Sequence, residues 1–194
     1  MYGHYLEVNG HKIYGYCRYF NLYKGVTEYF PSGSHFVEVG SFLGQSTAAM
    51  GYLIEQSGKN IVFDAVDIFE LSEFSDQEHF EVLKEFNNDL FGAFKNNLKL
   101  AGVEKYVNIL KMTSEEASKQ YEDNSLDFVL IDASHEYKDV KNDINYWLPK
   151  IKQGGILAGD DFLDGKQEVA YAVRDTIGLE NIRVDNSTWI HIKN

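Results

Sequence analysis

Cysteine and proline are scarce in this sequence, and each shortage excludes a class of architecture. The chain of 194 residues has 1 cysteine, Cys17, so no disulfide can form within it and nothing indicates an oxidising compartment. Its 2 prolines are Pro31 and Pro149, and no Gly/Ser/Pro-rich linker or internal repeat divides the chain. We therefore expect one folded unit rather than several domains joined by linkers.

Long apolar runs and basic clusters are also missing. No apolar stretch approaches the roughly 20 residues of a membrane span, and the first residues, MYGHYLEVNGHK, lack the basic lead and apolar run of a secretion signal. We therefore expect a cytoplasmic protein with no membrane partner. A formal net charge of -12, from 18 basic and 30 acidic residues, disfavours nucleic acid as a partner and favours a small molecule.

What the sequence does contain is an alternation of short apolar runs with amphipathic segments. Strands are predicted over 35–39, 61–67, 106–111, 126–132 and 154–159, and helices over 16–30, 45–56, 88–101, 136–148 and 167–177, with another helix capped by Ser114. The ending NIRVDNSTWIHIKN predicts two strands joined around 185–187. This order is typical of an α/β, doubly wound fold, in which a seven-stranded, mostly parallel sheet ends in an antiparallel hairpin.

Residues that follow the predicted strands are the candidates for ligand binding, because open α/β sheets bind ligands at the carboxyl ends of their strands. A glycine-rich turn from Gly40 to Gly44 follows the first strand and leads into a helix whose first N–H groups are unpaired. Phe42 replaces the second glycine of a dinucleotide fingerprint, which disfavours NAD. Asp67 ends the second strand, where a carboxylate either binds the hydroxyls of a ribose or only caps a helix.

Four segments together carry a family resemblance: VEVGSFLGQST, AVD, the turn from Thr113 to Glu116, and DFVLIDASHEY with GGILAGDD. In this order they resemble the successive motifs of class I S-adenosylmethionine-dependent methyltransferases, over about residues 35 to 194. Within that superfamily, the ID-x-x-H-x-Y run and the later K-x-G-G-x-x-x-x-D-D are similar to the metal-dependent sugar O-methyltransferases of macrolide and aminocoumarin pathways and their uncharacterised relatives. The resemblance implies a Rossmann-like fold and S-adenosylmethionine as cofactor.

The resemblance also implies roles for individual residues. Glu38 and Gly40 would line the methionine end of the cofactor, Asp67 the ribose, and Ser114 or its neighbours the adenine. His135 would be the catalytic base. The full implied cofactor set is Glu38, Gly40, Ser41, Phe42, Gly44, Ser46, Asp67, Ser114 and Asp132, the implied metal ligands are Asp132, Asp160 and Asp161, and the implied catalytic residues are His135 and Asp132.

The residues themselves give the acidic cluster an independent basis. Neighbouring parallel strands lie about 4.8 Å apart, so Asp132 and the pair Asp160-Asp161 would finish side by side if their strands pair. Carboxylates in that arrangement repel one another unless a cation joins them, and oxygen donors favour Mg²⁺, Mn²⁺ or Ca²⁺. His135 would then remove a proton from an acceptor hydroxyl near neutral pH. The alternative is that these residues only begin helices and that no metal binds.

Two segments outside these motifs stay open between functional and structural roles. Residues 69–86 form a long connection that is either a lid over the acceptor or a helix packed on the sheet, and its aromatic residues are Phe69, Phe74, His79, Phe80 and Phe86. An extension at 1–34 precedes the domain at 35–194. Its tyrosines, Tyr14, Tyr16, Tyr19 and Tyr23, suggest acceptor binding, core packing or a homodimer contact.

Three hypotheses about function follow. The leading one is O-methylation of a hydroxylated small molecule, such as a sugar, assisted by a divalent cation. The second keeps the cofactor but uses His135 as base without a metal. The third is a binding module that retains S-adenosylmethionine without transferring methyl, whereas a nucleotide-dependent oxidoreductase is disfavoured by Phe42. Loss of activity on chelation favours the first, and tight binding without transfer favours the third.

Overall fold

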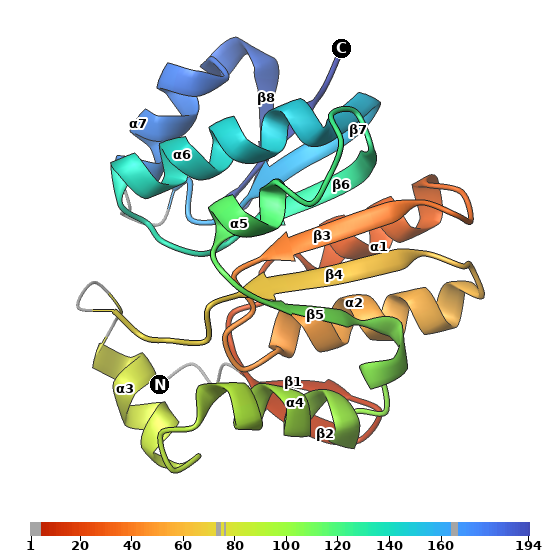
Figure 1. Cartoon of the computed structure of the whole chain (residues 1–194), viewed down its shortest axis with the longest axis vertical. Helices are drawn as coiled ribbons and strands as arrows, with labels where there is room; N and C mark the ends of the chain where they lie inside the picture. The colour runs from red at the N-terminus through yellow and green to blue at the C-terminus, as the bar shows by residue number, and fades with distance from the viewer. Residues whose placement is uncertain (1–4, 73–74, 76, 164–166) are drawn as a thin grey trace.

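A sheet of seven strands with helices on both faces forms the centre of the protein, in a computed structural model that describes residues 5–72, 75, 77–163 and 167–194 (Figure 1). The strands of the sheet are β3 (His35–Val39), β4 (Val62–Asp67), β5 (Asn108–Lys111), β6 (Leu126–Ile131), β7 (Ile151–Gly159), β8 (Ile182–Asp185) and β9 (Thr188–Ile192). Helices are α1 (Phe20–Tyr29), α2 (Gln45–Ser57), α3 (Gln77–Lys84), α4 (Leu90–Leu100), α5 (Ser114–Ser118), α6 (Tyr137–Trp147) and α7 (Gln167–Thr176). Short 3₁₀ turns lie at Glu104–Tyr106, Leu148–Lys150 and Leu179–Asn181.

The strand order is β5-β4-β3-β6-β7-β9-β8. Neighbouring strands from β5 to β7 are parallel, whereas β9 runs antiparallel to both β7 and β8. The predicted doubly wound sheet with its C-terminal hairpin is therefore confirmed. Each predicted apolar run forms a strand, although the boundaries shift, because backbone pairing with a neighbour rather than hydropathy decides where a strand begins.

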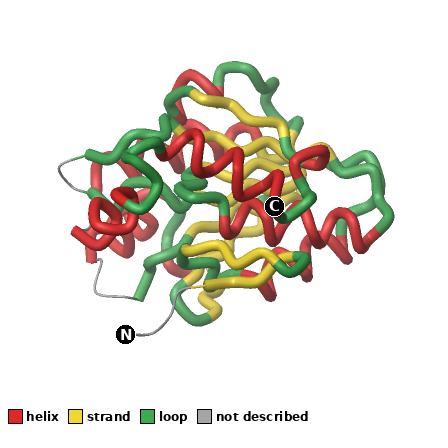
Figure 2. The backbone as a smooth tube through the Cα atoms, turned by 90° about the horizontal axis from the view of Figure 1, so that it is seen from below, coloured by secondary structure: helices red, strands yellow, loops and turns green. Residues whose placement is uncertain are grey.

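Alternation of buried side chains along the strands explains why helices cover both faces. In β3, Phe36 packs into a core shared with α1, α2 and α4, while Val37 and Val39 pack into a core shared with α5, α6 and α7. Figure 2, turned by 90°, shows the strands inside this arrangement of helices. Within the described residues, every helix is too short or too polar to cross a membrane.

The N-terminal extension contains a hairpin that the sequence analysis did not predict. Strands β1 (Tyr5–Val8) and β2 (His11–Tyr14) pair antiparallel around Asn9 and Gly10, whose φ angles of 48° and 82° fit a two-residue Asn-Gly turn. The helix expected at 16–30 begins only at Phe20. Residues 15–19, which we call the strap, are held in an irregular path because the Gln45 side chain binds the Ile13 carbonyl at 2.7 Å and the Cys17 N–H at 2.8 Å.

Candidate active site

The carboxyl ends of β3, β4, β6 and β7 meet at one edge of the sheet, and most of the residues predicted to bind ligands gather there (Figure 1). Val39 is in register with Val66 on one side and Ile131 on the other, and Ile131 is in register with Gly159. The residues that follow these positions are therefore neighbours in space, as expected for a ligand site in an open α/β sheet.

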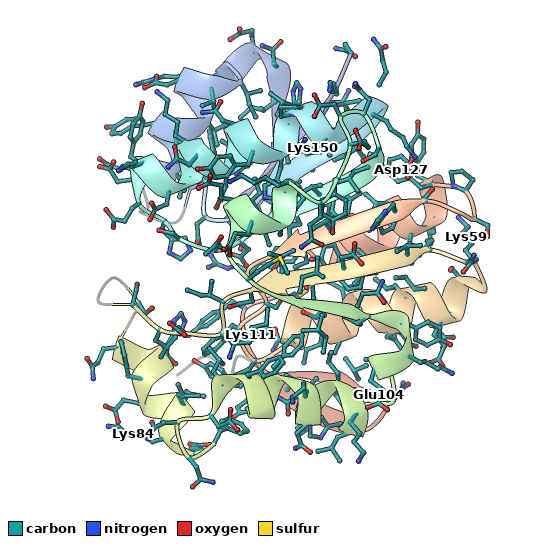
Figure 3. The ribbon with its side chains drawn as sticks, in the orientation of Figure 1. Lys59, Lys84, Glu104, Lys111, Asp127 and Lys150 are labelled. Carbon is teal, nitrogen blue, oxygen red and sulfur yellow. The ribbon has the colours of Figure 1, made fainter. Side chains whose placement is uncertain are left out.

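The opposite edge of the sheet carries charges with structural partners. Lys59 and Asp127, labelled in Figure 3, lie near the amino ends of the strands. The Lys59 ammonium donates to three backbone carbonyls at the end of α1. Asp127 accepts from the Lys152 ammonium at 2.8 Å and from the backbone N–H of His35 at 2.8 Å. These charged groups stabilise the fold through contacts within the protein. The candidate site is therefore at the carboxyl ends of the strands.

The glycine-rich turn after β3 depends on having no side chain at Gly40. Gly40 has a φ of +92°, and a Cβ there would overlap the backbone carbonyl oxygen of Asp132 at the end of β6. Only glycine fits both conditions. The turn from β3 and the turn from β6 therefore touch backbone to backbone.

Glu38 is fully buried directly before this turn. Ser46 and Thr47, in the first turn of α2, donate hydrogen bonds from their hydroxyls to its two carboxylate oxygens, with Thr47 at 2.6 Å. Burial raises the pKa of Glu38 to about 7, although the two hydroxyls act in the opposite direction. Ser46, predicted as a cofactor residue, thus belongs to a network that positions Glu38, and Thr47 is a member of this network that the sequence analysis missed.

Asp67 accepts hydrogen bonds from backbone rather than standing free. Its carboxylate binds the N–H groups of Ser41 at 2.7 Å, Phe42 at 3.0 Å and Phe69 at 2.6 Å. Burial raises the pKa of Asp67 even though all three donors favour the ionised form. In this structure Asp67 fixes the glycine-rich turn, and the expectation that it binds a ribose stays a prediction.

The helix after β5 is capped by Thr113, not by Ser114 as the sequence analysis predicted. Thr113 and Glu116 form a capping box in which each side chain binds the backbone N–H of the other residue. Ser114 is the first helical residue, and its hydroxyl accepts a hydrogen bond from the indole N–H of Trp147 at 2.9 Å. Its side chain therefore links α5 to α6, and contact with an adenine stays a prediction.

Asp132 and Asp161 both lie beside His135, as expected from the pairing of β6 and β7, whereas Asp160 has other partners. His135 Nε2 lies 2.7 Å from Asp161 Oδ2 and 4.0 Å from Asp132 Oδ1. Burial by itself lowers the pKa of His135, but the contacts with Asp132 and Asp161 outweigh burial and raise it to about 9. The imidazolium form of His135 is thus favoured at neutral pH, and the expectation that His135 removes a proton from the acceptor stays a prediction.

Asp160 and Asp161 are both buried but have different partners. Asp160 Oδ1 accepts from the hydroxyls of Ser187 at 2.6 Å and Thr188 at 3.3 Å, both at the turn of the C-terminal hairpin. Burial and the nearby Asp132 charge raise the pKa of Asp160. Asp161 has a φ of 61°, a left-handed conformation that is uncommon outside glycine and is often found at functional sites.

Two residues of the N-terminal extension complete the acidic cluster. Arg18 Nη2 lies 2.9 Å from Asp161 Oδ1, and Arg18 Nε lies 3.5 Å from Asp160 Oδ2. Tyr19 donates its hydroxyl to Asp132 Oδ2 at 2.9 Å. The sequence analysis assigned Arg18 no role; the only signal for it was that clustered carboxylates require a cation, which was attributed to a metal ion.

The aromatic residues of 69–86 divide between the two readings. Phe69 is buried against Phe91 and Phe94, so it packs the core. His79 on α3 stacks on Phe42 of the glycine-rich turn with ring centroids 4.6 Å apart and contacts Tyr16 of the strap at 5.6 Å. Phe74 lies outside the described residues. Helix α3 therefore contacts both the glycine-rich turn and the strap. A lid over the site would occupy this position.

The donor set fits a divalent cation by its chemistry. Asp132, His135 and Asp161 each offer one ligand atom, and these atoms lie within 4.8 Å of one another. Carboxylate oxygens are the ligands that Mg²⁺, Mn²⁺ and Ca²⁺ prefer. The same oxygens already have partners in this structure, however, because Arg18, His135 and Tyr19 face them.

Comparisons with known proteins agree with this geometry. Residues 37–162 match the model of a family described as "Methyltransferase domain", a range that includes the glycine-rich turn, His135 and all three aspartates of the cluster. A search of curated proteins finds none that matches. Because the family match covers most of the chain, it carries more weight than the distant structural likenesses that follow.

Solved structures share the fold at low sequence identity. The O-methyltransferase NovP is 14% identical, covers 90% of this chain and 79% of its own, and has a TM-score of 0.63. An O-methyltransferase from Bacillus cereus in complex with SAH is 11% identical, covers 89% and 81%, and has a TM-score of 0.57. CalS11, a TDP-rhamnose 3'-O-methyltransferase of calicheamicin biosynthesis, is 15% identical, covers 89% and 76%, and has a TM-score of 0.56.

Proposed function

The chain belongs to the family of methyltransferase domains and is an S-adenosylmethionine-dependent enzyme, and on this premise we propose that it methylates a hydroxyl oxygen of a small molecule such as a sugar. One observation carries the proposal: a cluster of acidic and imidazole side chains lies beside the glycine-rich turn. Its members are Asp132, His135, Asp160 and Asp161. A hydroxyl is a poor nucleophile until its proton is removed, and acidic and imidazole groups are the side chains that assist this removal.

The glycine-rich turn supports binding of the cofactor, because at Gly40 it has backbone alone packed against the turn after β6. Buried Glu38 lies directly before this turn, and we assign its carboxylate to a positively charged amino group. When bound, S-adenosylmethionine supplies a methyl group on a positively charged sulfur, which leaves as a neutral thioether when the oxygen attacks in line.

His135 is the residue that we assign to the proton. In the neutral form of His135, Nε2–H faces Asp161, and the other ring nitrogen, Nδ1, accepts the proton that the hydroxyl loses as the O–CH₃ bond forms and the S–CH₃ bond breaks. Asp132 and Asp161 stabilise the resulting imidazolium, since they hold the pKa of His135 at about 9 in the absence of ligands. Proton removal therefore has a strong driving force once the imidazole is neutral, but only a minor fraction of the resting protein is in that form near pH 7.

A divalent cation would be held by the carboxylates of Asp132 and Asp161, whose ligand atoms lie within 4.8 Å of each other, with Asp160 as the third ligand that the family resemblance implies. It would lower the pKa of an acceptor hydroxyl bound to it. The alternative, methyl transfer without a metal, is favoured by one observation: Arg18 already faces two of the three carboxylates. Activity that survives EDTA and is lost in His135→Ala supports the alternative. Loss of activity both on chelation and in Asp160→Asn supports the metal-assisted form.

A small acceptor is proposed on the strength of the charge and of the structural neighbours. A net charge of -12 repels polyanions, and the structural neighbours NovP and CalS11 are O-methyltransferases, the second a TDP-rhamnose 3'-O-methyltransferase. The test is transfer of a labelled methyl group across panels of sugars, nucleotide-linked sugars, phenols and structured RNA. Transfer to members of the hydroxylated small-molecule panels supports the proposal, whereas transfer to RNA alone contradicts it.

A further inference from the structure

Hydrogen bonds and ion pairs within the protein satisfy the carboxylates of the acidic cluster. Some of these partners, Arg18 and Tyr19, belong to the strap. Asp161 contacts His135 through Oδ2 and Arg18 through Oδ1. Asp160 accepts two hydroxyls at Oδ1, and its Oδ2 faces Arg18. Asp132 accepts Tyr19 at Oδ2 and faces His135 with Oδ1. An ion that binds these oxygens must therefore displace at least one of the present partners.

Arg18 is the most exposed of the described side chains that contact Asp160 and Asp161. Its side chain is 39% exposed, whereas the side chains of Asp160 and Asp161 are 1% and 7% exposed. The guanidinium thus lies between solvent and the two buried carboxylates. A guanidinium and a divalent cation both satisfy carboxylate oxygens by charge, and both cannot occupy the same oxygens at close range, because like charges repel.

Displacing Arg18 has consequences for the whole strap. The polar contacts that fix residues 15–19 to the carboxyl edge of the sheet include the Cys17 N–H to Gln45, the Tyr19 hydroxyl to Asp132, and the Arg18 ion pairs. Two of these three attachments go to carboxylates that the proposed metal would use. Release of Arg18 and of the Tyr19 hydroxyl leaves the strap held by Gln45 and by the packing of Tyr16 and Tyr19.

We propose that Arg18 is the built-in counter-cation of the acidic cluster, and that Arg18 and a divalent cation compete for Asp160 and Asp161. Cation binding then weakens the attachment of Arg18 to the carboxylates, and the attachment of Arg18 weakens cation binding. In the absence of metal, Arg18 holds the strap at the acidic cluster, and metal binding releases this attachment so that an acceptor can reach the carboxylates. This inference rests on the metal-assisted form of the proposed function and adds a role for the N-terminal extension.

The first test measures affinity for Mn²⁺ alone, by the electron paramagnetic resonance signal of free Mn²⁺. Wild type, Arg18→Gln and the matched control Arg174→Gln are compared, since Arg174 pairs with Asp175 on the exposed side of α7. We expect Arg18→Gln to bind Mn²⁺ about tenfold more tightly than wild type, a typical size for coupling between two sites, and Arg174→Gln to match wild type. Equal or weaker binding in Arg18→Gln, or no binding in either protein, overturns the proposal.

The second test uses the unmodified chain, so it does not depend on a variant that folds. Cys17 is the single cysteine and lies in the strap beside Arg18. We expect saturating Mn²⁺ to raise the rate of Cys17 alkylation by N-ethylmaleimide several-fold, measured by mass spectrometry, and Arg18→Gln to react fast with or without Mn²⁺. A wild-type rate that Mn²⁺ leaves unchanged overturns the proposal. Methyl transfer measured in EDTA reports separately on the proposed function, so the two failures are distinguishable.

Discussion

His135 Nε2 lies 2.7 Å from Asp161 Oδ2, so an ion pair joins the loop after β6 to the loop after β7. The pair explains why the pKa of His135 rises to about 9 despite burial, since the carboxylates of Asp132 and Asp161 stabilise the charged imidazolium. The same contact places the proposed base among the proposed metal ligands. Any change to one of these side chains therefore acts on both functions.

Replacing His135 with alanine should abolish most of the chemistry but spare the cofactor site. We expect methyl transfer to fall by about 10²–10⁴-fold, the usual contribution of a general base, while the affinity for S-adenosylhomocysteine stays close to wild type. Radiolabelled methyl transfer and calorimetric titration measure the two effects. The matched control is His191→Ala, since His191 on β9 contacts only the backbone carbonyl of Asn181 among the hydrogen bonds described. Retention of full activity in His135→Ala would exclude the assigned role.

Substitutions at two glycines with the same φ angle distinguish the cost of backbone strain from the cost of a steric clash. Gly40 and Gly33 both have a φ of +92°, but a Cβ at Gly33 meets nothing within 4 Å, whereas one at Gly40 overlaps the Asp132 carbonyl. We expect Gly33→Ala to cost about 1 kcal/mol from strain alone, and Gly40→Ala to cost roughly 1–3 kcal/mol more and to lose cofactor binding. Urea unfolding and cofactor titration are the measurements. Equal destabilisation by both substitutions would contradict the close approach of the two turns.

The buried carboxyl of Glu38 should make stability depend on pH. Its pKa is about 7 in the folded protein and near 4.5 when solvated, so folding favours the protonated form. Stability contributed by this group is therefore present at low pH, falls as the pH rises from about 4.5 to about 7, and is constant above that. We expect the unfolding free energy of wild type to decrease by about 1–3 kcal/mol relative to Glu38→Gln between pH 5 and pH 8.

Denaturant titrations at these two pH values measure the effect of Glu38, and other titrating groups cancel in the difference between the two proteins. The exposed Glu85 provides the control, because Glu85→Gln removes a carboxylate that is already solvated. An identical pH dependence in wild type and Glu38→Gln would show that the carboxyl has no raised pKa.

Removal of divalent cations tests the metal-assisted form of the reaction. We expect EDTA to lower methyl transfer at least about tenfold, and added Mg²⁺ or Mn²⁺ to restore it, since the ion would lower the pKa of the acceptor hydroxyl. Asp160→Asn should reproduce the loss without rescue by metal. Asp123→Asn is the control, because Asp123 pairs with Lys150 at an exposed position. Undiminished transfer after exhaustive chelation would leave only the metal-free form.

Most of the sheet was predictable because its strands are buried on both faces and therefore read as continuous apolar runs. The meeting of Asp132 with Asp160 and Asp161 was predictable for the same reason, since the pairing of β6 with β7 follows from the order of strands. The N-terminal hairpin was missed although Asn9-Gly10 is a strong turn signal, because the tyrosines around it were read only as possible contacts.

The sequence could not determine which side chains pair with one another at the carboxyl ends of the strands. Pairing of Arg18 with Asp160 and Asp161 joins residues far apart in the chain, and no local pattern encodes such a contact. The three backbone N–H groups that reach the Asp67 carboxylate come together only once the turn has folded, while its contact with a ribose stays a prediction. Thr113 and Ser114 are both good capping residues, and only the backbone path selects between them.

Asp160 accepts hydrogen bonds from Ser187 and Thr188 of the C-terminal hairpin and forms an ion pair with Arg18, which precedes α1. Segments far apart in the chain therefore meet at one carboxylate. Because β9 pairs with β7, opening of the C-terminal hairpin would take both hydroxyl donors away from this acid. The hairpin thus supports the acidic cluster as well as the sheet, and a substitution that loosens β9 would reach the site without touching any residue assigned to the chemistry.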